Sequence, residues 1–179
     1  MLTLPPNYKK NTPVPLIVGV HGGPDNHWWN SYIGSPHTLD TPICFGCLAD
    51  QGFAIFRPNE HGSTGYGPNF LLSNYRKLGV IDYKDIMLGV KSLIKDRIAT
   101  PKHIGIWGWS YGGFMAAWAN EQSNMFNAVV DGAGVSDYPS LEGTAEYHSM
   151  TRNIGVPFWV NSKPWIAISP AFHVSLSHA

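Results

Sequence analysis

Gly105-Ile106-Trp107-Gly108-Trp109-Ser110-Tyr111-Gly112-Gly113 is the stretch of sequence that decides the fold. An apolar run stops abruptly at Gly-x-Ser-x-Gly, and a small-residue helical pattern follows it. This order is typical of a strand, a strained turn that carries a serine, and a helix. Gly108 and Gly112 flank Ser110 at points where a Cβ would collide with the neighbouring strand or helix. The pentapeptide alone is equally compatible with a glycine-rich turn that has no chemistry, so its surroundings must decide.

Those surroundings favour an α/β fold. Apolar runs at residues 16–20, 52–57, 104–109 and 127–131 lack alternation, which suits strands that are buried on both faces of a parallel sheet. Residues 82–97 place apolar side chains at three- and four-residue spacing and predict a packing helix, with Asp82 as its cap. Strands and helices that alternate in this way predict a parallel sheet with right-handed crossovers.

The remaining segments carry weaker patterns. Residues 1–13 are predicted to be a loop, and a helix is predicted over 39–50, although Pro42 and Gly46 weaken it. After residue 132 the pattern dissolves into loops and short helices, which are expected near 135–138, 142–150 and 165–168.

Composition limits the class of protein. A chain of 179 residues fits one domain, and only 13% of its residues are charged, against a usual ~25%. The formal net charge is zero, which argues against nucleic acid or an anionic membrane as the main partner. No apolar stretch approaches the ~20 residues that span a bilayer, and no segment reads as a secretory leader, so a cytoplasmic location is favoured.

Metal and redox motifs are weak in this sequence. Cys44 and Cys47 form a Cys-x-x-Cys pair, but neither the further ligands of a zinc site nor the context of a thioredoxin-type motif accompanies them. They are interpreted as fortuitous thiols. His27, His37 and His103 show no metal-ligand spacing, and no cofactor is expected.

Two loops at the carboxyl ends of predicted strands could serve a site. His21-Gly22-Gly23-Pro24 follows the first strand, and in hydrolases of this architecture such a loop supplies part of the oxyanion hole. A tight turn is the alternative interpretation. Residues 59–67 form a polar, glycine-rich loop after the second strand, where open parallel sheets place their sites.

Residues 16–24, 53–67, 104–113 and 126–138, taken in order, resemble the hydrolase domain of the prolyl oligopeptidase family of serine peptidases. The resemblance implies an α/β-hydrolase that attacks short peptides and is usually preceded by a β-propeller. It also implies that Ser110 is the nucleophile and that the amides of Gly23 and Tyr111 form the oxyanion hole. The chain departs from the family where His61 stands in place of the usual arginine, which puts any contact of that guanidinium in doubt.

The same resemblance implies an apolar or proline-like residue at the cleavage site. Val135 and Tyr138 fall where the family lines its specificity pocket, and Trp109 lies beside the nucleophile.

A serine nucleophile needs a base and an acid, and in this architecture the order is Ser, Asp, His. Ser169-Pro170 resembles the family segment that comes shortly before the strand of the acid. The chain is therefore predicted to be a single partial hydrolase domain over residues 1–179, C-terminally incomplete, with the propeller and the acid and histidine segment absent. An internal triad would have to draw on Asp131, Asp137, His148, His173 and His178. Loop and capping roles are the preferred interpretation of these five. His21, in the oxyanion loop, is interpreted as a structural hydrogen-bonding group.

The leading functional prediction is a serine peptidase that forms an acyl-enzyme on Ser110, with its Asp and His beyond Ala179. An esterase of the same architecture and a catalytically inactive fragment that acts only in association are the alternatives. An unpaired apolar sheet edge after the fourth predicted strand would favour self-association.

Overall fold

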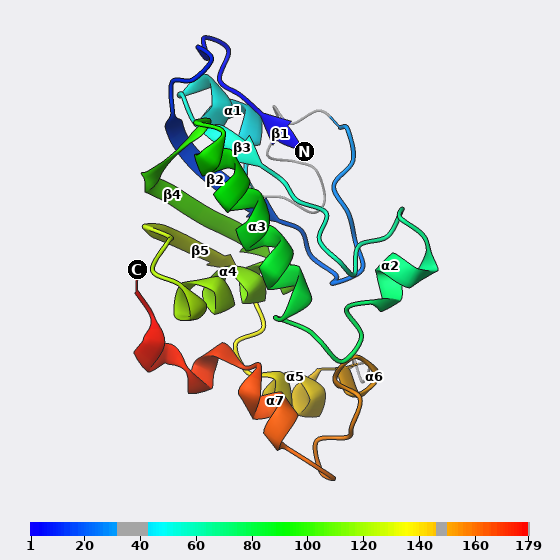
Figure 1. The fold of residues 1–179 in the computed structure, drawn as a ribbon. Coiled ribbons are helices and arrows are strands. Elements are labelled where there is room, and N and C mark those ends of the chain that lie inside the picture. The colour runs from blue at the N-terminus through cyan, green and yellow to red at the C-terminus, as the bar shows by residue number, and fades with distance from the viewer. Residues whose placement is uncertain (32–42, 146–149, 179) are drawn as a thin grey trace.

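The structure is a computed structural model, and it describes residues 1–31, 43–145 and 150–178. Five strands form one sheet in the order β1-β3-β2-β4-β5 (Figure 1). Four of them run parallel, and β1 is antiparallel to β3. The strands are β1 (Leu2–Thr3), β2 (Val14–Val20), β3 (Ala54–Phe56), β4 (Ala99–Trp109) and β5 (Ala128–Gly132). The four strands predicted from the apolar runs are confirmed, in an α/β fold.

The prediction of a loop over residues 1–13 is wrong at β1. Leu2 pairs with Phe56 of β3, and the Met1 amine donates a hydrogen bond of 2.7 Å to the Arg57 carbonyl. A strand of two residues has no periodicity of its own, because its position depends on a partner more than fifty residues away in the sequence.

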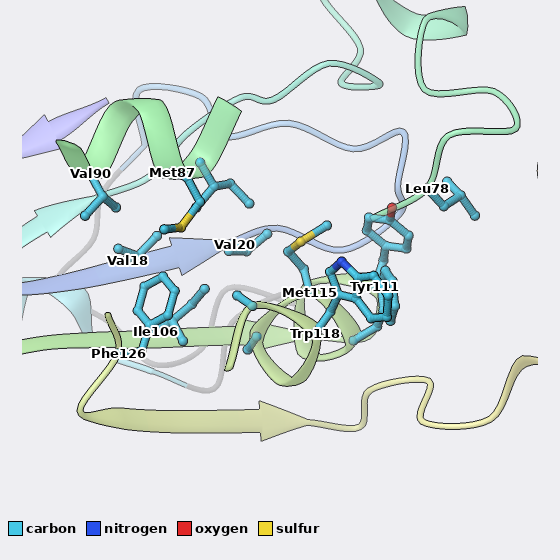
Figure 2. Packing of buried hydrophobic residues seen from close by; sticks show 14 of the residues in the cluster. Val18, Val20, Leu78, Met87, Val90, Ile106, Tyr111, Met115, Trp118 and Phe126 are labelled. Carbon is cyan, nitrogen blue, oxygen red and sulfur yellow. The ribbon is translucent and has the colours of Figure 1, made fainter. Parts of the chain in front are cut away.

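The sheet is covered on both faces. Leu16, Val18 and Val20 of β2 face a core shared with α3 (Ile81–Lys95) and α4 (Tyr111–Gln122). Figure 2 shows Met87 and Val90 of α3 above Val18 and Val20. The intervening positions of β2 face α1 (Phe45–Asp50), which packs so closely that a Cβ on Gly19 would lie 2.6 Å from the Phe45 ring. Covering on both faces explains why the apolar run of the central strand β2 does not alternate.

The predicted helices differ from the observed ones mainly at their ends. Helix α3 begins after Val80, so Asp82 lies inside the first turn and the prediction that it caps the helix is wrong. Helix α1 begins at Phe45, and residues 39–42 of its prediction lie outside the described ranges. Helix α2 (Pro68–Leu72) was not predicted.

Short helices follow β5 and lie below β5 and α4 in the view of Figure 1. They are α5 (Tyr138–Thr144), α6 (Met150–Ile154), α7 (Lys163–Ala167) and two single turns at Pro170–Phe172 and Val174–Leu176. The predictions over 135–138 and 142–150 miss the start of α5, which Asp137 sets as its N-cap, and residues 146–149 of the second prediction lie outside the described ranges.

Cys44 and Cys47 form a disulfide at the start of α1, which corrects their interpretation as fortuitous thiols. The Cys44 sulfur accepts a hydrogen bond of 3.1 Å from the Cys47 amide. No helix in the described ranges has both the length and the apolar character needed to cross a membrane.

Candidate active site

Ser110 occupies the turn between β4 and α4 with φ 58° and ψ −119°, a conformation that is strained for a residue with a side chain. Its amide donates a hydrogen bond of 2.8 Å to the Gly132 carbonyl, and its carbonyl accepts one of 3.0 Å from the Phe114 amide. The strand, strained turn and helix predicted from the sequence are therefore confirmed. The side chain of Ser110 is exposed at the carboxyl end of the sheet.

The glycines around Ser110 are required by space. A Cβ on Gly108 would lie 2.0 Å from the Gly112 carbonyl oxygen, and a Cβ on Gly112 would lie 2.3 Å from the Val20 carbonyl oxygen. Both distances are far below van der Waals contact, and the atoms concerned are backbone atoms that cannot rotate away. The predicted collisions are confirmed, and they show how tightly the turn is packed against β2.

The loop that follows β2 reaches the same turn. A Cβ on Gly22 would lie 3.5 Å from the Ser110 Cβ, so the loop and the serine are neighbours. Gly23 has φ +127°, a value that favours glycine, and a cis peptide bond joins it to Pro24. The structure thus brings the loop of Gly22 and Gly23 next to Ser110, which the start of α4 at Tyr111 follows directly.

His21 anchors this loop from inside the protein. Its Nδ1–H donates to the Gly22 carbonyl at 2.8 Å, while Nε2 lies 2.9 Å from the Ser63 hydroxyl and 3.5 Å from a Glu60 carboxylate oxygen. All three side chains are buried. Burial lowers the pKa of His21 and raises the pKa of Glu60 well above its usual value. The interpretation of His21 as a structural group agrees with these contacts.

The predicted substrate-binding residues divide between surface and core. Trp109 is 41% exposed beside Ser110, whereas Tyr138 is fully buried and packs edge-on against Phe114 at a ring distance of 5.1 Å. Val135 is half-buried against the same core. Burial raises the pKa of the Tyr138 phenol, whose oxygen has no hydrogen-bond partner among the described residues.

A cavity of about 220 Å³ is lined partly by the loop that follows β2, and sequence reasoning missed it. It joins segments that are far apart in the chain, so no local pattern could have indicated it. Its lining residues come from residues 23–25, residues 62–78 and α6: Gly23, Pro24, Asp25, Gly62, Leu71, Leu72, Asn74, Tyr75, Leu78, Met150, Arg152 and Asn153.

The candidates for an internal acid have local partners. Asp137 caps α5 by accepting from the Ser140 amide at 3.2 Å, which confirms its capping interpretation. Asp131 accepts from the Gly134 amide at 2.8 Å, and burial raises its pKa.

The candidate bases are similarly placed. His173 Nε2–H donates to the Ala167 carbonyl at 3.1 Å and its ring lies edge-on to Trp118, while His148 lies outside the described residues. The amide of His178 donates to Asn120 at 3.4 Å. No side chain within the described ranges hydrogen-bonds to the Ser110 hydroxyl. Those ranges also contain no group of three metal-ligating side chains.

His61 takes the position of the expected arginine and joins the polar loop to α3. Its Nδ1 and its backbone amide both contact the Asp85 carboxylate, and its ring stacks on Phe70. The residue therefore has a partner of its own in place of any guanidinium contact.

Comparisons with known proteins agree with this geometry. A family model described as the prolyl oligopeptidase family, Peptidase_S9, matches residues 44–176. The uncharacterized peptidase YuxL of Bacillus subtilis is 35% identical over 146 residues, which are 81% of this chain and 21% of that protein. Dipeptidyl-peptidase 5 of Aspergillus oryzae is 31% identical over 173 residues, 93% of this chain and 22% of that protein.

Solved structures give the same result. The acylaminoacyl peptidase of Pyrococcus horikoshii superimposes with a TM-score of 0.83 at 27% identity, over 99% of this chain and 28% of that one. An acylaminoacyl peptidase in complex with Z-Gly-Gly-Phe-chloromethyl ketone matches with the same score and identity. The chain spans only 21% to 28% of the length of these four proteins.

Proposed function

Because the chain belongs to the prolyl oligopeptidase family, we propose that it carries the nucleophile of a serine peptidase that cleaves short peptides through an acyl-enzyme on Ser110. The observation that carries this proposal is the strained turn itself. Backbone strain persists only where the surroundings enforce it, and here β2, β5 and α4 all hold an exposed serine at the carboxyl end of a sheet. A turn without chemistry would have no need of this strain.

The proposed reaction begins when Ser110 Oγ attacks the carbonyl carbon of the scissile bond and gives its proton to a base. The tetrahedral oxyanion then lies between the amides of Gly23 and Tyr111, and each such donor is worth about 3 kcal/mol in serine hydrolases. Collapse expels the amine with the proton held by the base, leaving an ester on Ser110. Water attacks this ester in the second half of the reaction and regenerates the serine.

We place the base and its acid beyond Ala179. The side chains of Asp131, Asp137 and His173 are already engaged in hydrogen bonds to backbone groups. The relatives are four to five times longer than the matched region, which leaves room for both groups. We further propose that Trp109 contacts the substrate at the surface, with Val135 and Tyr138 forming the wall behind it.

A fluorophosphonate probe tests this assignment directly, because it reacts only with a serine that has an activated hydroxyl. The 179-residue chain and a longer product of the same coding frame would be labelled side by side, each with a Ser110→Ala variant. Ser140→Ala is the matched control, since Ser140 is also exposed and lies on α5. We expect labelling of the longer product only, lost in Ser110→Ala and retained in Ser140→Ala.

Other outcomes would contradict specific parts of the proposal. Labelling that survives Ser110→Ala would remove Ser110 as the nucleophile. Labelling of the 179-residue chain would show that its base lies within it. A labelled product that hydrolyses nitrophenyl esters but no peptide anilide would identify an esterase, and no labelling of either product would identify a protein that acts only by association.

A further inference from the structure

Asp82 is a buried carboxylate whose hydrogen-bonding capacity is filled. It is fully buried in the first turn of α3, and no lysine or arginine within the described residues pairs with it. Oδ2 accepts hydrogen bonds from the Tyr111 hydroxyl at 2.5 Å, Asn74 Nδ2 at 3.1 Å and the Gly79 amide at 3.2 Å. Oδ1 accepts one from the Tyr83 amide at 2.8 Å. Every partner is a donor, so the surroundings of Asp82 require both of its oxygens to accept hydrogen bonds, as an ionised carboxylate does.

One of these partners is the residue that follows the nucleophile. Tyr111 is the first residue of α4, and its ring is buried in the core, in contact with Phe114 at 5.1 Å (Figure 2). The hydroxyl of this ring donates a hydrogen bond to Asp82. The backbone amide of the same residue is the proposed oxyanion donor. The side chain of Tyr111 is therefore fixed at its tip as well as along its length.

We propose that Asp82 is a positioning residue for the oxyanion hole, because it holds Tyr111 through the phenolic hydroxyl and so sets the direction of the Tyr111 amide. This inference rests on the proposed function of Ser110 and Tyr111. It adds a second constraint to the turn: the Gly132 carbonyl holds Ser110 on the side of β5, and Asp82 holds Tyr111 on the side of α3.

The same carboxylate also holds the wall of the neighbouring cavity. Asn74 lines that cavity, and its side-chain nitrogen donates to Asp82, while the Gly79 carbonyl accepts from the Trp118 indole at 2.8 Å. Asp82 thus joins the turn of the nucleophile to residues 74–79, which lie beside the oxyanion loop. A displacement of the Asp82 carboxylate would therefore move the turn at Ser110 and residues 74–79 together.

The protonation states fit this role. Burial raises the pKa of Asp82, and the hydrogen bonds from Tyr111, Tyr83, Asn74 and Gly79 act in the opposite direction by stabilising the anion. Burial and the nearby Asp82 charge raise the pKa of Tyr111 well above its usual value, so its hydroxyl keeps the proton that it donates.

The test compares Asp82→Asn, Tyr111→Phe and the double variant in the longer product that the fluorophosphonate probe labels. Asparagine keeps the shape but turns an NH2 group toward donors, and phenylalanine removes only the hydroxyl. We expect each single variant to lower the maximal labelling rate of Ser110 about 10-fold to 100-fold, with the half-saturating probe concentration unchanged, since misplacing a catalytic group by ~1 Å costs about 100-fold. The double variant should be labelled no more slowly than Asp82→Asn, because both changes remove the same hydrogen bond between the Tyr111 hydroxyl and Asp82.

Asp96→Asn is the matched control, since Asp96 is exposed at the other end of α3, where it accepts a hydrogen bond from the Ser92 hydroxyl; its labelling rate should stay within about 2-fold of wild type. Thermal unfolding defines the folded fraction of each variant, and rates are expressed per folded molecule. Wild-type labelling rates per folded molecule in both single variants would overturn this inference but leave the proposed function of Ser110 standing. Fully additive losses of labelling rate in the double variant would do the same. A wild-type protein that the probe does not label would overturn the proposed function and this inference with it.

Discussion

Gly112→Ala tests how firmly the turn at Ser110 is held against the sheet. The added Cβ would lie 2.3 Å from the Val20 carbonyl oxygen and 2.8 Å from the His21 carbonyl oxygen, whereas ordinary contact begins at 3.4 Å. Since the clash is between backbone groups, α4 and β2 must separate by about 1 Å. Overpacking lowers the free energy of unfolding by about 1–3 kcal/mol. The higher helix propensity of alanine raises it by at most ~1 kcal/mol.

We therefore expect Gly112→Ala to lower the free energy of unfolding by about 2 kcal/mol and the labelling rate of Ser110 about 100-fold. Gly143→Ala is the matched control, because Gly143 lies in helix α5 and a Cβ there meets nothing within 4 Å. That variant should stabilise the protein by about 0.5–1 kcal/mol. Urea unfolding followed by circular dichroism measures the stabilities. Equal stability and equal labelling in Gly112→Ala and the wild type would refute the reasoning.

Three further predictions concern the core, a buried carboxylate and the sheet edge. Phe114→Ala should lower the free energy of unfolding in urea by about 3–5 kcal/mol, because Phe114 is fully buried between Tyr111 and Tyr138; a loss below ~1 kcal/mol would contradict the packing. Glu60→Gln should stabilise the protein more at pH 8 than at pH 5. The raised pKa of Glu60 means that the folded wild type loses stability as the pH rises above the usual value of 4.5, and an equal effect at both pH values would exclude this cause. Strand β5 has β4 as its one neighbour among the described strands and leaves Val130 half exposed, so we expect the chain to self-associate through this edge and Val130→Lys to reduce the association. Light scattering that finds the wild-type chain monomeric at tens of micromolar would contradict this expectation.

The fold could be predicted from the sequence where the signal is local. Each of the four parallel strands contains an apolar run, although β4 begins five residues before its run, and the turn at Ser110 has a glycine on each side for reasons that the distances at Gly108 and Gly112 confirm. These features depend on residues that are close in the chain, so composition and spacing are enough to identify them.

Contacts between distant residues could not be predicted in the same way. β1 exists because Leu2 meets Phe56, and Asp82 is buried because Tyr111 reaches it across 29 residues of sequence. The aspartate near the start of a helix favours a capping role on local grounds, and the capping prediction failed because tertiary partners outweigh that preference. The disulfide between Cys44 and Cys47 has no sequence signal beyond the spacing itself.

Helix α3 has a larger part in the site than its packing pattern indicates. Asp82 and Asp85 are three residues apart and therefore lie on one side of its N-terminal end, where the helix dipole favours negative charge. Asp82 holds the turn of the nucleophile through Tyr111, and Asp85 holds the polar loop through His61. Because α3 is fixed to the sheet by buried apolar side chains of its own, both carboxylates are presented from a rigid support. His61 fits the same scheme, since its backbone amide and its Nδ1 both hydrogen-bond to the Asp85 carboxylate and so tie the polar loop to α3. Both Tyr111 and the polar loop are thus held by carboxylates of one helix, and a shift of α3 would move them together.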